Sequence, residues 1–242
     1  MARQGGVMKL HLESRPVGEV LIVQCQGRIV GGNEVLKLHA LVGESIGKYG
    51  DIVLQCDQVE FIDSSGLGAL VRLLQTARAK RRDVKLSRLP PHIRKTLEVT
   101  HLLSQFEVYD SVEEAITAAY LGSRYSPGKA GDARPRILCI YESSDVCTFL
   151  REVLCNAGYN ALTTSNIDDA KILLKATKAK LAVVSARMQS VYGKPTRQAL
   201  QEIDPAVSLI VLDENFAAQD PGEAAEKLLR EVRDVAMAGK AV

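Results

Sequence analysis

The chain has 242 residues, a length that suits two domains of about 100–200 residues each. Hydrophobic residues make up 46% and charged residues 25%, so there is enough apolar material for one or two ordinary cores. The formal net charge is +2 and both halves are nearly neutral, which argues against a nucleic-acid-binding surface.

Strands and helices alternate along the first half of the chain. Apolar runs with β-branched residues predict strands, and apolar residues at helical spacing predict the helices between them. Ser111 and Glu114 have the spacing of a capping box. The alternation predicts an α/β domain over residues 8–121. The expected elements are strand 19–30, helix 33–50 capped by Asn33, strand 51–63, helix 66–82, strand 84–89, helix 90–103, strand 106–110 and helix 111–122.

Residues 122–135, GSRYSPGKAGDARP, break this periodicity. They are polar and rich in Gly, Pro and Ser, which is typical of a linker. The pattern then restarts with short apolar strands of the kind found in parallel sheets. Residues 136–242 are therefore expected to form a second α/β domain. Its expected elements are strand 136–142, helix 143–159, strand 161–165, helix 166–180, strand 181–186, helix 195–203, strand 208–213 and helix 221–239.

The stretch FIDSSGLGAL (61–70) places an acid and two serines between a strand and a helix. One interpretation is a helix cap, because Asp and Ser are preferred at that position. The other is a phosphoacceptor site. In its favour, the stretch has more capping groups than a cap requires. Gly66 and Gly68 let another molecule approach the backbone, and the N–H groups at a helix start favour an anion.

The segment VEFIDSSGLGALVRLLQTARAK resembles the signature of the STAS family, the anti-sigma factor antagonists. The resemblance extends upstream through VLIVQCQGRIVGGNEVLKLHALV and downstream through VKLSRLPPHIRKTLEVTHLLSQFEVYDSVEEAI, so it covers residues 14–120. QCD at 55–57 and RRD at 81–83 depart from the family's usual residues but lie outside the acceptor. The resemblance implies a sheet of four or five strands with helices on one side.

The same resemblance implies a phosphorylation switch in a domain that is not itself an enzyme. Ser64 would be phosphorylated by an anti-sigma factor that is an ATP-dependent serine kinase. Asp63 would orient the site, Ser65 would lie beside the acceptor, and Gly66 would permit close docking. The unphosphorylated protein would bind the kinase and free a sigma factor, which regulates transcription. A metal-dependent serine phosphatase of the PP2C type would reset the switch.

Residues 136–234 resemble the receiver domain of response regulators, but the residues that such a domain uses for phosphorylation are replaced. Tyr141 and Glu142 stand where an acidic pair is expected, and Ser185 stands at the place of the phosphoacceptor aspartate. Asp213 replaces a Thr or Ser, and a fifth strand with its lysine is shortened or missing. The resemblance implies a truncated, flavodoxin-like pseudo-receiver that serves dimerisation or partner docking.

Two other classes of function are open as alternatives. The chain could be an unregulated STAS scaffold, or a soluble accessory subunit of a transport or signalling complex. An enzyme is disfavoured, because the sequence shows no catalytic constellation and no glycine-rich phosphate loop. Glu142 and Asp213 could hold a metal only with two carboxylates, so we expect neither a metal nor a cofactor.

The expected location is the cytoplasm. The five cysteines are an odd number without a CxxC pair, which is typical of a reducing compartment. No apolar run approaches the ~18 residues of a membrane helix, and the N-terminus lacks the apolar segment of a signal peptide. We expect no membrane span and no direct contact with nucleic acid.

Overall fold

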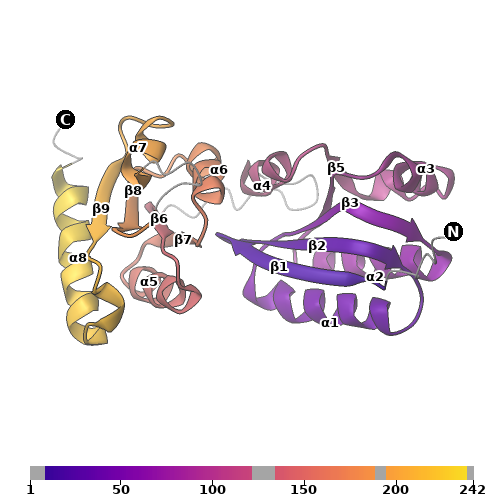
Figure 1. Ribbon diagram of the computed structural model, residues 1–242, viewed down its shortest axis with the longest axis horizontal. Helices are drawn as coiled ribbons and strands as arrows, with labels where there is room; N and C mark the ends of the chain where they lie inside the picture. Colours follow the sequence, from indigo (N-terminus) through magenta and orange to yellow (C-terminus); the bar gives the residue numbers. More distant parts are fainter. Residues whose placement is uncertain (1–8, 122–133, 189–194, 239–242) are drawn as a thin grey trace, which may run out of the picture. The chain divides into compact units, whose positions relative to one another are not determined.

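The computed structural model describes residues 9–121, 134–188 and 195–238. The chain divides into two units, Met1–Lys129 and Ala130–Val242 (Figure 1), and each is described by itself. Residues 122–133 of the expected linker lie outside the described residues.

The first unit contains a five-stranded mixed sheet in the order β1-β2-β3-β4-β5. β1 runs antiparallel to β2, and the other neighbours are parallel. The elements are β1 (His11–Val17), β2 (Val20–Ile29), α1 (Asn33–Lys48), β3 (Ile52–Ile62), α2 (Ser64–Ala79), β4 (Val84–Ser87), α3 (Pro91–Val99), the short 3-10 helix η1 (Leu103–Gln105), β5 (Glu107–Tyr109) and α4 (Val112–Leu121).

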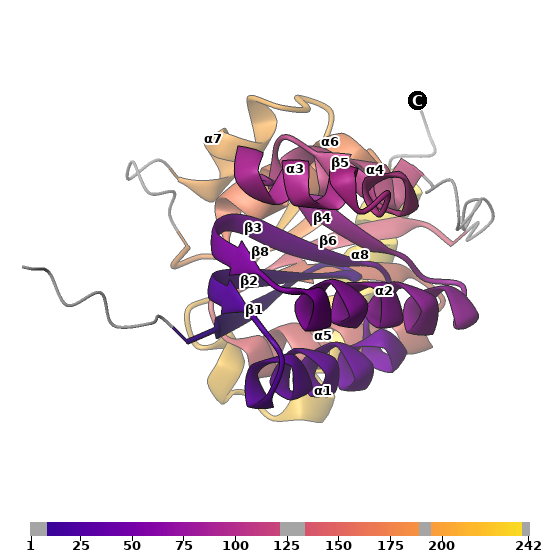
Figure 2. The ribbon, with the colours of Figure 1, turned by 90° about the vertical axis from the view of Figure 1, so that its right-hand side faces the viewer.

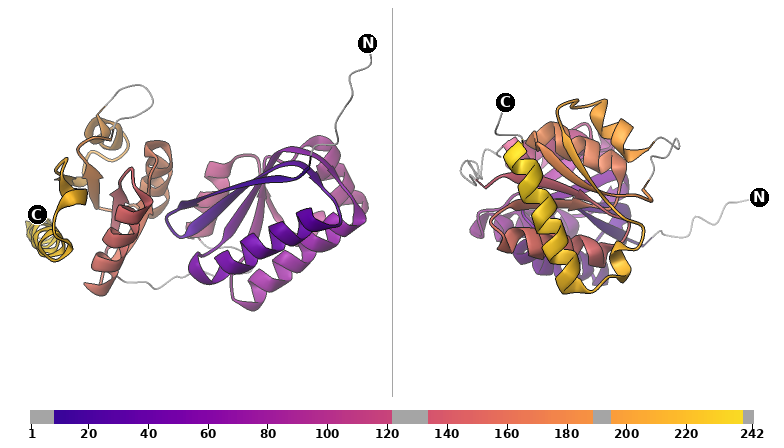
Figure 3. Two further views of the ribbon diagram at one scale, coloured as in Figure 1. Left: turned by 60° about the horizontal axis from the view of Figure 1, so that its bottom comes forward. Right: turned by 90° about the vertical axis from the view of Figure 1, so that its left-hand side faces the viewer.

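Helices cover both faces of this sheet. All four residues of β4 are therefore buried, whichever face their side chains are on. On one face, α1 and α2 pack on alternate strand residues, in a core that includes Leu38, Leu54 and Leu73. α4 packs on the opposite face against β3, β4 and β5, where Ile116 is fully buried. Figures 2 and 3 show the helices on the two sides. The expectation of helices on one side is therefore wrong for α4.

Three further details differ from the sequence-based expectation. Strand β1 was not expected, because most of its side chains are exposed and it has no apolar run. The cap of α1 is Gly32, with φ of 115°, and Asn33 is already helical. Helix α3 ends at Val99 instead of continuing to residue 103, since His101 has a φ of 58°, which a helix does not admit.

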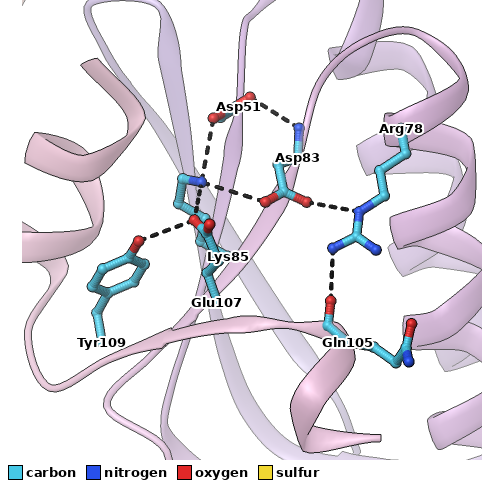
Figure 4. Close-up of polar contacts among 7 residues, drawn as sticks. All are labelled: Asp51, Arg78, Asp83, Lys85, Gln105, Glu107 and Tyr109. Atoms are coloured by element: carbon cyan, nitrogen blue, oxygen red, sulfur yellow. Dashed lines mark hydrogen bonds and ion pairs between the residues drawn. The ribbon is translucent and has the colours of Figure 1, made fainter. Parts of the chain in front are cut away.

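A buried ammonium group joins three strands of the first unit (Figure 4). The Lys85 side chain is 0% exposed. Its Nζ lies 2.8 Å from Glu107 Oε2, 3.4 Å from Asp83 Oδ2 and 3.5 Å from Asp51 Oδ2. Asp51 and Asp83 directly precede β3 and β4, and Glu107 begins β5. One cation therefore connects the starts of three neighbouring strands.

Hydrogen bonds from other elements complete this network. Burying an ion costs several kcal/mol unless it is paired and hydrogen-bonded, so the additional donors explain how the carboxylates are tolerated. Burial raises the pKa of Asp51, although the charge of Lys85 acts in the opposite direction. The other bonds join the Asp83 N–H to Asp51 at 2.9 Å, the Tyr109 hydroxyl to Glu107 at 3.0 Å, Arg78 to Asp83 at 3.3 Å and Arg78 to the Gln105 carbonyl at 2.6 Å.

We expect Lys85→Met to destabilise this end of the sheet by about 3–5 kcal/mol, because it leaves buried carboxylates without their cation. Hydrogen-exchange mass spectrometry in increasing urea would measure the opening free energy of peptides that cover β3, β4 and β5. Lys37→Met is the matched control, since Lys37 is an exposed residue of α1. Equal exchange in the two variants would show that the ion cluster does not stabilise the fold.

The second unit has a four-stranded parallel sheet in the order β7-β6-β8-β9. The α/β alternation predicted from the sequence is confirmed here. Asn166 caps α6, because its side chain accepts from the Asp168 N–H at 2.8 Å. The elements are β6 (Arg136–Ile140), α5 (Ser144–Asn156), β7 (Asn160–Thr164), α6 (Ile167–Thr177), β8 (Leu181–Ser185), α7 (Thr196–Gln201), β9 (Ser208–Leu212), η2 (Phe216–Ala218) and α8 (Pro221–Ala238).

The strand order reverses between β6 and β8. From β6 the chain crosses to β7 on one side and then to β8 on the other. In open parallel sheets, ligands bind outside the carboxyl ends of the strands at such a reversal. Helices α5 and α8 share the core on one face, with Leu150 and Leu228 fully or almost fully buried. Glu142 follows β6 and Ser185 ends β8, so both lie at this reversal of strand order.

Candidate functional site

The Asp63 carboxylate connects two segments at the start of α2. One oxygen, Oδ1, accepts from the backbone N–H of Gly66 at 2.7 Å, which makes Asp63 the N-cap of the helix. The other, Oδ2, accepts from the backbone N–H of Gly31 at 3.2 Å, in the turn between β2 and α1. The Gly66 N–H holds the pKa of Asp63 below its usual value, with smaller contributions from Gly31, Ser65 and Arg28. The helix-cap interpretation is therefore correct for Asp63.

The two serines after Asp63 are exposed in the first turn of α2. Neither serves as the cap, because Asp63 already does so. Among the described residues, none forms a hydrogen bond with the Ser64 hydroxyl. An exposed hydroxyl without a partner, at a helix start that is capped by Asp63 and tied to the β2–α1 turn, is accessible to a second protein.

Gly66 makes a close approach within the chain. A Cβ on Gly66 would lie 2.1 Å from the carbonyl oxygen of Ile29, and residue 66 is buried. Only glycine therefore lets the start of α2 rest against the end of β2. This internal contact accounts for the glycine within the fold, and the expected role of Gly66 in partner docking stays a prediction. Gly68 is half-buried and meets only Arg72, so it is the glycine that leaves open surface.

A cation and an exposed ring lie beside the serines. The Arg28 guanidinium carbon is 4.7 Å from the centroid of the Phe61 ring, and the Phe61 side chain is 44% exposed. Irregularities in the pairing of β2 with β3 bring Arg28 opposite Phe61, and Gly27 supplies the φ of 94° near them. The sequence analysis missed both residues, because this register follows from the tertiary structure.

A polar contact joins the carboxyl ends of β6 and β8 in the second unit. The Ser185 hydroxyl donates to Glu142 Oε1 at 2.9 Å and accepts from the Arg187 N–H at 3.2 Å. Tyr141 is buried, and its ring centroid is 6.3 Å from that of Phe216. The structure thus brings Glu142 and Ser185 together and directs Tyr141 into the core.

Asp213 has its own partners at the end of β9. It accepts from Gln219 at 2.9 Å and from Lys227 at 3.3 Å. Partial desolvation raises the pKa of Asp213, but these hydrogen bonds outweigh it and lower the pKa below the usual value. In the described ranges, no group of three or more His, Cys, Asp or Glu residues could hold a metal ion.

The mixed sheet and the turn from Asp63 to Gly66 agree with one family. Residues 11–115 match the family model of the STAS domain. This STAS segment contains β1 to β5 and the exposed serines. The resemblance to the STAS family is confirmed for this part of the chain. For the second unit, the resemblance to a receiver domain stays a prediction. In the part of the chain that the structure describes, no helix is long and apolar enough to cross a membrane.

Proteins similar to this chain are named as anti-sigma factor antagonists. BtrV of Bordetella bronchiseptica, which carries that name, is 27% identical over 100 residues, or 40% of this chain and 85% of BtrV. The solved structure of the antagonist SpoIIAA in its unphosphorylated form is 22% identical, with a TM-score of 0.39, over 44% of this chain and 92% of that one. An antagonist from Mycobacterium paratuberculosis is 20% identical, with a TM-score of 0.41, over 46% and 93%.

We expect Asp63→Ala to cost about 1 kcal/mol of stability through loss of the cap. Asp63→Asn keeps an acceptor and should cost much less. Because the folded pKa of Asp63 is lowered, the charge contributes stability above the ordinary pKa of Asp, and this is lost as the pH falls through the folded pKa. Urea unfolding followed by circular dichroism at neutral and acidic pH measures both effects.

Ser65→Ala is the control for this series, since Ser65 neighbours the cap without providing it. A cap role for Asp63 would be contradicted if Asp63→Ala and Ser65→Ala unfolded at the same urea concentration.

Proposed function

We propose that the protein is an anti-sigma factor antagonist whose binding is switched by phosphorylation of Ser64. In its unphosphorylated state it binds and sequesters an anti-sigma factor that is a serine kinase, and so regulates transcription. The observation that carries the proposal is the exposed, unpartnered hydroxyl of Ser64 on a helix start that Asp63 caps and ties to the β2–α1 turn. The match of the STAS segment and the names of its relatives support it.

The chemistry of the switch needs little from this chain. The Ser64 Oγ attacks the γ-phosphoryl group of ATP, ADP leaves, and the hydroxyl proton passes to a base of the kinase. Asp63 holds the acceptor in place, Ser65 lies beside it, and Gly66 sets the position of the helix. The phosphate adds about −1.5 to −2 charge to the docking surface, which weakens binding. A PP2C-type phosphatase removes it.

The second unit supports this function as a pseudo-receiver. The place of an acceptor aspartate is taken by Ser185, whose hydroxyl is bonded to Glu142. We assign this unit a role in dimerisation or partner docking. The protein itself is a binding protein that needs no cofactor. It acts in the cytoplasm, where ATP is available and the five cysteines, all free in the structure, stay reduced.

The proposal predicts phosphate on Ser64 when the serine kinases of the same host and ATP are supplied. Mass spectrometry would locate it, and Ser64→Ala should abolish it. Ser65→Ala should leave it in place. The absence of phosphate on Ser64 with every kinase would favour an unregulated scaffold or an accessory subunit.

The switch predicts that Ser64→Asp weakens binding to the kinase at least about tenfold, because a charge is introduced into a docked surface. Ser64→Ala should bind like the unmodified protein, as measured by calorimetry. Ser104→Asp is the matched control, since it adds the same charge at an exposed serine of η1, away from the start of α2. Equal affinity of Ser64→Ala and Ser64→Asp would contradict the switch.

For the second unit we expect no acyl phosphate after incubation with acetyl phosphate and Mg²⁺, because Ser185 offers no carboxylate. Intact-mass measurement would detect one added phosphoryl group. A phosphoryl group on an acid within residues 134–188 or 195–238 would contradict the pseudo-receiver assignment.

A further inference from the structure

A groove of about 420 Å³ lies between α1 and α2, on the two helices that begin at the candidate site. Both helices start at the carboxyl ends of neighbouring parallel strands, so their first turns lie side by side. Gly31, which precedes α1, would place a Cβ 3.0 Å from the Ser65 side chain. The groove is lined by Val35, Leu36, His39, Arg72, Gln75 and Thr76.

The side chain of Arg72 extends from this groove to Gly68, in the second turn of α2. Ser64, Gly68 and Arg72 follow one another at intervals of four residues, so they share one face of α2. Helical side chains lean toward the N-terminus. Arg72 follows this rule, because its Nη1 lies 3.5 Å from where a Cβ of Gly68 would be. The glycine leaves that face uncovered. The cation therefore lies about one helical turn, ~6 Å along the axis, from the Ser64 backbone.

Arg72 is exposed and available for a new partner. It forms no ion pair with any residue inside the described ranges. Its neighbour across the groove is His39, whose Nε2 is buried without a hydrogen-bond partner in the described part of the chain. Burial lowers the pKa of His39, and the charge of Arg72 lowers it further.

We infer that Arg72 binds the phosphate on Ser64 and leaves the α1–α2 groove when it does so. The inference deepens the proposed function, since it concerns the same acceptor. A phosphoserine presents three oxygens to the planar guanidinium, which is suited to bidentate contacts. The groove then loses its cation, so one modification changes two adjoining parts of the surface. Through the position of Arg72, the surface of the groove therefore depends on whether Ser64 is phosphorylated.

The test uses the full-length chain with phosphoserine encoded genetically at position 64, so it needs no kinase. ³¹P NMR gives the second pKa of the phosphoserine, which is ordinarily about 6. If the Arg72 guanidinium pairs with the phosphate, the second pKa of the phosphoserine should be about half a unit lower with Arg72 present than in the Arg72→Gln variant. Arg72→Lys should recover part of that shift. Lys80→Gln is the control, because Lys80 is an exposed cation at the far end of α2.

A second readout in the same samples follows the His39 ring by NMR. When phosphate draws Arg72 away, the pKa of His39 should rise toward its ordinary value. Arg72→Gln should raise the pKa of His39 even in the unphosphorylated protein. In this variant the phosphate on Ser64 should then cause no further rise. The other charged groups near the two helix starts are Arg28, Glu34 and Asp63, and all variants retain them.

Equal phosphoserine pKa values in Arg72→Gln and Lys80→Gln would overturn the inference. If the pKa of His39 is the same with and without the phosphate on Ser64, Arg72 does not leave the groove, and that part of the inference is overturned. Because the phosphate is installed during translation, either failure concerns Arg72 alone. Failure of the proposed function would appear separately, as absence of phosphate on Ser64 after treatment with host kinases.

Discussion

The candidate site depends on the two oxygens of one carboxylate. Asp63 caps α2 through the Gly66 N–H and holds the β2–α1 turn through the Gly31 N–H. A side chain at position 66 would collide with the Ile29 carbonyl, so the glycine and the carboxylate together fix where α2 begins. With the cap provided by Asp63, the hydroxyl groups of the adjacent serines are left at the surface. The helix-cap interpretation and the phosphoacceptor interpretation are thus compatible.

The first unit separates its buried charges from its candidate site. Lys85 and its three carboxylates lie where β3, β4 and β5 begin, and Ser64 follows the end of β3. Well-paired buried ions make one end of the sheet rigid and specific in its packing. At the other end of the sheet, Phe61 and Ser64 are exposed and Arg28 is half-buried against the Phe61 ring. A protein that presents a surface to a partner needs both properties.

The second unit has a four-stranded parallel sheet whose polar residues near the reversal of strand order are already paired. Glu142 and Ser185 satisfy each other there, and Asp213 is held by Gln219 and Lys227. Polar groups that already have partners offer little to a metal ion or a phosphoryl group.

Much of the architecture was determined by local patterns in the sequence. Alternating apolar residues and helical spacing predicted nearly all strands and helices, and the DSSG stretch marked the site, because these signals depend on neighbours a few residues apart. The sequence could not indicate β1, whose side chains are largely exposed, or α4 on the second face of the sheet. Only the tertiary structure decided that Gly66 rests on Ile29, that Arg28 stacks on Phe61, and that Arg72 lies over Gly68 beside His39. The physical reason is that strand register and helix packing bring together groups from separate elements, whereas a sequence pattern records only the order of residues along one.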